Sequence, residues 1–231
     1  MSRVQDTATI APPRYRSSRS PGGEGVAFRE ALLAGLAPDG GLYLPDRVPA
    51  LPARWRDAQS LAELAAAVLE PWLEEPGPET LTGLLARALD FPAPLRPLAR
   101  GRWLLELFHG PTLSFKDFGA RTMARLMDHY LQGSGRRLTI LVATSGDTGS
   151  AVADGFADLA NLRVVLLYPA GGVSDVQERQ LTAQRPGLTT LAVRGSFDDC
   201  QRLVKAAFGD PARSHLELSS ANSINVGRLL P

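Results

Sequence analysis

Apolar residues recur with a helical period through most of the first 97 residues of the chain. Ser60 precedes one of these stretches, and we expect it to cap a helix, with Glu63 completing a capping box. Leu42 to Leu44 is expected to be a short extended piece, and the proline-spaced segment 92–97 a linker. The predicted helices cover 26–36, 61–73 and 79–89. The pattern thus predicts a mostly helical N-terminal domain over residues 1–97.

After this segment the pattern changes to β-rich apolar runs separated by amphipathic stretches. Strands are predicted over 103–108, 138–143, 162–168, 188–193 and 216–218. Helices are predicted over 118–131, 148–157, 174–184 and 197–208, with Val176 among the inward positions of the third and Ser196 as the cap of the last. Strands that alternate with helices indicate an α/β fold, a parallel sheet with helices on both faces.

Composition narrows the class of protein. The chain has 231 residues, of which 44% are hydrophobic and 21% charged, and its formal net charge is +1, so nothing favours a nucleic-acid or membrane partner. No apolar run reaches the length of a membrane span, and the N-terminus lacks the apolar core of a secretory signal. A single cysteine, Cys200, is typical of a reducing compartment. We therefore expect a cytoplasmic protein, without a metal site.

The stretch 109–119 places one lysine among apolar side chains. Lys116 follows a Gly-Pro turn and has Leu113, Phe115 and Phe118 as neighbours. Apolar surroundings favour the neutral amine, which is the form that attacks an aldehyde. The alternative is a solvated lysine in the first turn of a helix, with Asp117 exposed beside it.

A second polar stretch, 143–149, lies between a predicted strand and the helix after it. Backbone N–H groups and the helix dipole at such a junction favour an anionic ligand. Thr144, Ser145 and Thr148 add hydroxyl groups, and Gly146 lets a ligand approach the backbone. The alternative is an ordinary capped turn, with Asp147 or Thr148 as the N-cap.

Together these two stretches resemble the signature motifs of the threonine synthases, a family of the fold-type-II, tryptophan-synthase-β-like pyridoxal-phosphate enzymes. Three further segments resemble parts of the same family, in the same order along the chain: 35–43, 168–181 and 222–231. The resemblance covers the chain from about Tyr15, and five ordered motifs are far more specific than any one of them.

The resemblance implies a pyridoxal 5'-phosphate lyase that converts O-phospho-L-homoserine and water to L-threonine and phosphate. Lys116 would hold the cofactor as a Schiff base and then carry protons. The other residues that the resemblance brings into the site are Phe115 and Asp147 beside the cofactor, and Thr144, Ser145, Gly146, Thr148, Asn222 and Ser223 beside the substrate. Related enzymes often carry asparagine where Asp147 stands. His109 is either a structural partner or a site residue, and Asn222 and Ser223 could instead cap a helix before Val226.

One departure from the family concerns the cofactor phosphate. The family's glycine-rich phosphate loop lies downstream of the 222–225 segment, beyond the last residue given, and Gly171-Gly172 is the nearest substitute. We therefore expect residues 98–231 to be the incomplete first part of the catalytic domain. We also expect this truncated chain to be inactive alone and to associate with itself or with a missing C-terminal half. The alternatives are a non-catalytic fragment or pseudoenzyme, and an O-phosphohomoserine phospho-lyase that makes a 2-oxo acid.

Overall fold

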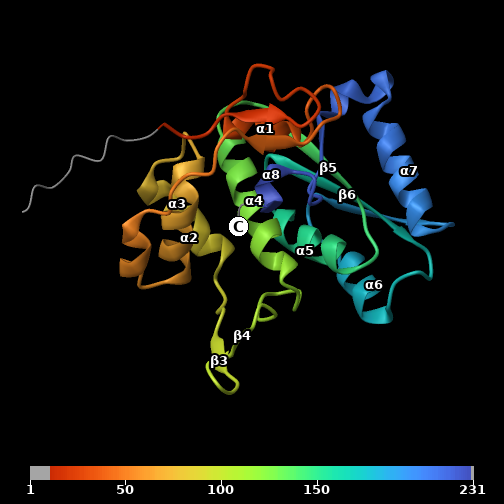
Figure 1. Ribbon diagram of the computed structural model, residues 1–231. Helices are drawn as coiled ribbons and strands as arrows, with labels where there is room; N and C mark the ends of the chain where they lie inside the picture. The colour runs from red at the N-terminus through yellow and green to blue at the C-terminus, as the bar shows by residue number, and fades with distance from the viewer. Residues whose placement is uncertain (1–10, 230–231) are drawn as a thin grey trace, which may run out of the picture.

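The computed structural model describes residues 11–229, so the first ten residues of the predicted N-terminal domain and the last two of the 222–231 motif lie outside the described residues. The N-terminal helices gather at one side, the parallel sheet and the helices that cover it lie at the other, and a two-stranded hairpin projects away from the body of the molecule (Figure 1). Helix α4 (Lys116–Leu131) runs through the middle of this arrangement. No helix in the described part of the chain is long and apolar enough to cross a membrane.

The three helices predicted for the N-terminal part are confirmed, the first two with shorter bounds and the third displaced by one residue. They are α1 (Phe28–Ala34), α2 (Leu61–Leu69) and α3 (Pro78–Ala88). Strands β1 (Tyr15–Ser17) and β2 (Tyr43–Pro45) pair antiparallel beside them. The α-helical part of α2 ends at Leu69, and the next residues form a 3-10 turn that contains Pro71, which has no backbone N–H to continue the helix.

The capping box predicted for α2 is only half present. Ser60 Oγ accepts a hydrogen bond from the Glu63 N–H at 3.2 Å, as expected. The Glu63 carboxylate, however, accepts from the N–H of Gln59 at 2.7 Å, one residue before the cap. The helix start is therefore stabilised by both side chains, but not reciprocally.

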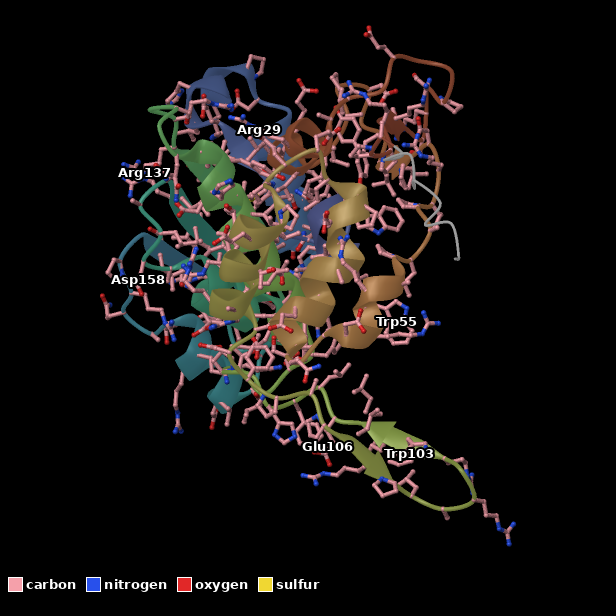
Figure 2. The ribbon with its side chains drawn as sticks, turned by 90° about the vertical axis from the view of Figure 1, so that its left-hand side faces the viewer. Arg29, Trp55, Trp103, Glu106, Arg137 and Asp158 are labelled. Atoms are coloured by element: carbon pink, nitrogen blue, oxygen red, sulfur yellow. The ribbon has the colours of Figure 1, made fainter. Side chains whose placement is uncertain are left out.

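The predicted linker and the first predicted strand were wrong in their details. Leu95–Pro97 is a strand, β3, and it pairs antiparallel with β4 (Trp103–Leu105), so the two form a hairpin outside the parallel sheet. Pro97 stands at the end of its strand, where its missing N–H is tolerated. The hairpin projects from the body of the molecule, and the Trp103 side chain is 60% exposed (Figure 2).

The parallel sheet confirms the predicted α/β class. Its strand order is β7-β6-β5-β8, all parallel, with β5 (Leu138–Ala143) and β6 (Leu162–Pro169) at the centre. The edge strands are β7 (Leu188–Val193) and β8 (Leu218–Ser219). The predicted strand 216–218 begins later than expected because a 3-10 helix extends to Leu216.

Alternation along β5 divides the apolar core between the two faces of the sheet. Ile140 and Val142 belong to the main core, together with α4 and α5 (Asp147–Phe156). Leu141 and Ala143 face the second cluster, which α7 (Phe197–Phe208) covers with Cys200 and Val204. Helices therefore lie on both faces, as the strand–helix alternation predicts.

The main core runs without interruption from the N-terminal helices to the sheet. Met123 and Met127 of α4 are fully buried, and they belong to the same cluster as Phe28 of α1 and Leu81 of α3. Helix α8 (Val226–Leu229) also packs on α4. Helix α6 (Asp175–Leu181) is shorter than predicted, and Val176, expected to point inward, is 64% exposed. Burial around α4 fixes the position of its first residue, Lys116.

Candidate active site

The structure brings the two polar stretches together at the carboxyl end of the parallel sheet. Lys116 opens α4, and Asp147 opens α5 directly after the β5 strand and its loop. Lys116 Nζ lies 3.3 Å from Asp147 Oδ2, which makes an ion pair. The carboxyl end of parallel strands is where such sheets bind ligands.

The surroundings of Lys116 are less apolar than its sequence neighbours suggest. Its side chain is 24% exposed, and its Nζ lies 4.8 Å from the centroid of the Phe115 ring. Leu113, however, points to solvent, and Phe118 packs edge-to-face on Phe91 at 5.0 Å instead of covering the amine. The expected apolar enclosure of the lysine is therefore wrong for this structure: one ring and one carboxylate flank it.

Asp147 is held by two donors. Gln177 of α6 donates from Nε2 to Asp147 Oδ1 at 2.8 Å, and Lys116 contacts the other oxygen. The Gln177 hydrogen bond, followed by Lys116, holds the pKa of the Asp147 carboxyl below its usual range. Asp147 does not cap the helix, since Gly146 occupies the N-cap position of α5 and Asp147 is its first residue.

Thr144 has an internal role that the sequence did not predict. It is buried, and its Oγ1 accepts hydrogen bonds from the N–H groups of Gly146 (3.1 Å) and Gly149 (2.8 Å). We had expected the Thr144 hydroxyl to face a ligand. In the structure it binds the backbone of its own loop and so fixes the conformation of that loop. The hydroxyl-bearing residues of the loop nearest solvent are Ser145, which is exposed, and Thr148, which is half-buried.

Gly146 has a backbone conformation that favours glycine, with φ of +139°. The Gln177 amide packs against it so closely that a Cβ at this position would collide with it. The open approach to the Gly146 backbone that we expected is thus covered by Gln177. A ligand reaching this backbone has to displace the Gln177 side chain.

An open hollow of about 450 Å³ adjoins Asp147 and residues 110–115, the loop that leads to Lys116 and is called the lysine loop below. It is lined by Leu105, Leu107, Phe108, Thr112, Leu113, Ser114, Phe115 and Asp147. His109 lies beside this loop, and its Nε2 is 2.7 Å from Glu106 Oε2. Glu106 in turn pairs with Arg96 of the hairpin at 3.4 Å, at the base of the hairpin (Figure 2). This chain of contacts favours the structural role for His109.

The segment that contains Asn222 and Ser223 follows β8 directly, and β8 pairs with β5 through Thr139–Leu218 and Ile140–Ser219. Asn222 is half-buried and Ser223 exposed. Asn225 is fully buried, and its side chain bonds the backbone of Leu32, Ser220 and Gly227, so its role is structural.

Arg228 is a candidate site residue that the sequence analysis did not single out. Its guanidinium lies against Gly119, which is one turn of α4 beyond Lys116, and Nη1 donates to the Ala221 carbonyl at 2.8 Å. No carboxylate among residues 11–229 pairs with it, and loss of hydration lowers its pKa. A desolvated cation that packs on the helix of Lys116 is a candidate partner for an anionic ligand. The only sequence signal was its place in the 222–231 segment.

We expect the substitution Gln177→Leu to raise the pKa of Asp147 toward its usual value, because the strongest donor to the carboxylate is lost. A carboxyl group whose pKa is lower in the folded state than in the unfolded state stabilises the fold at pH values above the unfolded-state pKa, roughly 4 for aspartate. This contribution to stability is lost as the pH falls through the folded-state pKa. The variant should therefore show a smaller loss of stability on acidification. Carboxyl NMR titration of Asp147 measures the shift.

Gln180→Leu on the same helix is the matched control, since no hydrogen bond of the described residues joins Gln180 to Asp147. If Asp147 titrates at the same pH in wild type and Gln177→Leu, the Gln177 hydrogen bond is not what lowers the pKa of Asp147.

Comparison with known proteins gives two family matches in series. Residues 14–89 match the family model described as threonine synthase N terminus, and residues 89–226 match that of the pyridoxal-phosphate dependent enzymes. The threonine synthase of Haemophilus influenzae is 43% identical over 214 residues, which are 90% of this chain and 49% of the relative. That of Escherichia coli (strain K12) is 42% identical over 212 residues, with the same shares.

Solved structures show the same likeness. The PLP-bound threonine synthase from Brucella melitensis aligns with a TM-score of 0.86 at 41% identity, over 94% of this chain and 49% of that one. The threonine synthase from yeast aligns with a TM-score of 0.85 at 35% identity, over 96% and 48%. The chain thus spans about half the length of the relatives that it matches.

Proposed function

Because the chain belongs to the pyridoxal-phosphate-dependent enzyme family, we propose that it carries the cofactor lysine of a threonine synthase. The reaction is the conversion of O-phospho-L-homoserine and water to L-threonine and phosphate. The observation that carries the proposal is the meeting of Lys116 and Asp147 at the carboxyl end of the sheet, 3.3 Å apart. The match of residues 14–89 to the threonine synthase N terminus supports this choice within the family.

The residues around Lys116 fit pyridoxal phosphate. The amine lies beside an open hollow, with an aromatic ring at 4.8 Å on one side and a carboxylate on the other. The chain has only two lysines, and Lys205 is exposed on α7, away from this loop. When bound, the cofactor withdraws electrons from the substrate's α carbon and so stabilises the carbanion formed there. Lys116 would hold its aldehyde covalently and, once released, move protons at Nζ.

The remaining residues of the site have separate tasks in this proposal. The loop residues Ser145 and Thr148, at the N-terminus of the ten-residue helix α5, are suited to the substrate's carboxylate. Thr144 holds that loop in shape from inside. Arg228 would supply the cation for the leaving phosphate, and Asn222 and Ser223 would be further donors. Phe115 and Asp147, which both contact the Lys116 amine, would hold the cofactor on either side of this amine.

The division of the chain belongs to the same proposal: residues 1–97 as the N-terminal-like domain and 98–231 as the first part of the catalytic domain. The two family models meet at residue 89, close to the proposed boundary. The shared apolar core means that the two parts pack as one body in this structure. We also propose a cytoplasmic location, on the basis of the single cysteine.

The test is a titration with pyridoxal phosphate, followed by assays of phosphate and threonine from O-phospho-L-homoserine. We expect the protein that carries this chain to develop cofactor absorbance and to release threonine and phosphate in equal amounts. Phosphate with a 2-oxo acid and no threonine would instead identify a phospho-lyase. Absence of a cofactor complex would overturn the proposal in favour of a non-catalytic protein. The assay of residues 1–231 alone shows whether they suffice.

A further inference from the structure

Asp117, the residue after Lys116, points into the protein. Its side chain is fully buried. Oδ2 accepts a hydrogen bond from the Thr112 N–H at 2.9 Å, and Oδ1 accepts one from Thr112 Oγ1 at 2.6 Å. Both oxygens of the carboxylate are thus bound to a single residue in the loop that leads to the lysine. The exposed Asp117 of the alternative interpretation is not what the structure shows.

The same loop is shaped around this carboxylate at a second point. Gly110 lies so close to Asp117 that a Cβ at position 110 would be about 2.5 Å from Oδ2. Between these contacts the chain makes a tight turn, in which the Leu113 N–H donates to the Gly110 carbonyl at 3.0 Å and Leu113 has a φ of +59°. Such a conformation is unfavourable for leucine and requires support from its surroundings.

Among the described residues, no other side chain makes a short hydrogen bond to the backbone at the start of α4. Its N-cap residue, Phe115, makes no capping hydrogen bond, and the Ser114 hydroxyl accepts only a long one, 3.3 Å, from the Lys116 N–H. The charged Asp117 hydrogen bonds are shorter and stronger. Burial raises the pKa of the Asp117 carboxyl, and among its charged surroundings Asp154 also raises this pKa while Arg121 lowers it.

We propose that Asp117 is the positioning residue of the site. By accepting hydrogen bonds from Thr112 and packing against Gly110, it fixes the lysine loop and keeps the Lys116 amine directed at Asp147. This inference rests on the proposed function of Lys116. Asp117 itself touches neither the hollow nor the amine, and it acts only through the backbone it holds. Consecutive side chains on a helix point about 100° apart, so the first turn of α4 holds an anchor inside and an amine outside.

The test compares how fast Lys116 forms a borohydride-reducible adduct with pyridoxal phosphate in a set of variants. Asp117→Ala should slow adduct formation about ten- to a hundredfold, the range for losing hydrogen bonds to a charged group. Thr112→Val, which keeps the backbone donor, should have a smaller effect. Thr112→Ser keeps both donors and should slow the reaction less than Thr112→Val does. Thr112→Val also keeps the test decisive if Asp117→Ala does not fold.

A matched control separates positioning from general stability. Met127→Ala removes a fully buried side chain farther along the same helix and should lower the melting temperature without changing the adduct rate. If Met127→Ala slows the adduct as much as an Asp117 variant of equal melting temperature, Asp117 is merely structural. Adduct formation at the wild-type rate in Asp117→Ala and Thr112→Val would overturn the inference as well.

A second readout does not need the cofactor. After reductive methylation with labelled formaldehyde, the two lysines give separate NMR signals. Asp117→Ala should shift or broaden the Lys116 signal and leave that of Lys205 unchanged. If the wild type forms no adduct, the proposed function fails, while this signal still decides whether Asp117 positions the amine. Unchanged signals for both lysines would exclude the positioning role.

Discussion

Replacement of Lys116 by alanine should abolish the borohydride-reducible adduct with pyridoxal phosphate completely. The reason is chemical: only a primary amine can join the cofactor aldehyde in this way, and Lys116 is the lysine beside the hollow and Asp147. Turnover of O-phospho-L-homoserine should disappear with it, since the same amine carries the protons. The measurement is the absorbance after cofactor addition, followed by reduction and mapping of the labelled peptide.

The chain offers an unusually clean control for this experiment. Its only other lysine, Lys205, lies exposed on α7, so Lys205→Ala should leave the adduct at its wild-type level. The ion pair with Asp147 is half exposed, and its loss in Lys116→Ala should change stability little, by less than about 1 kcal/mol. A label that persists at the wild-type level in Lys116→Ala and disappears in Lys205→Ala would refute the assignment.

The parts of the fold that follow from local pattern could be predicted from the sequence. Strand β6 is predictable from an uninterrupted apolar run, and helix α7 from a capped amphipathic stretch. Both patterns depend on few long-range contacts. The β3–β4 hairpin could not be predicted in this way, because prolines at 94 and 97 are typical of a linker and the pairing of Leu95 with Leu105 crosses a turn without an apolar period.

The candidate site shows the same division between local and long-range information. Position along the chain places Lys116 and Asp147 at the ends of their elements, so their meeting at one edge of the sheet could be inferred. The direction in which each side chain points could not be inferred from the sequence. Thr144 turns inward to its own loop, and Asp117 turns inward to Thr112, because each satisfies buried backbone donors. Gln177 covers Gly146 from a helix thirty residues away, which no local motif encodes.

Arg121 connects the helix that carries Lys116 to its surroundings on two sides. Its side chain is 13% exposed, and its guanidinium has four acceptors: the carbonyls of Arg87 and Ala88 at the end of α3, and the carboxylates of Asp90 and Asp154. Arg185 binds the other oxygen of Asp154 at 3.0 Å. The network therefore fastens the N-terminal helices, α4 and α5 to one another five residues beyond the lysine.

We expect Arg121→Met to lower the free energy of unfolding by about 3 kcal/mol, the lower part of the range for breaking a buried ion pair, because Arg185 still compensates Asp154. Two α3 carbonyls also lose their donor, which adds to the loss. Urea unfolding followed by circular dichroism measures the change.

Arg121→Lys should recover only part of the lost stability, since one ammonium group cannot reach all the acceptors that are arranged around the planar guanidinium. Arg137→Met, at an exposed arginine (Figure 2), should change stability by less than about 0.5 kcal/mol. An Arg121→Met variant as stable as Arg137→Met would show that apolar packing alone holds α4, and with it Lys116, in place.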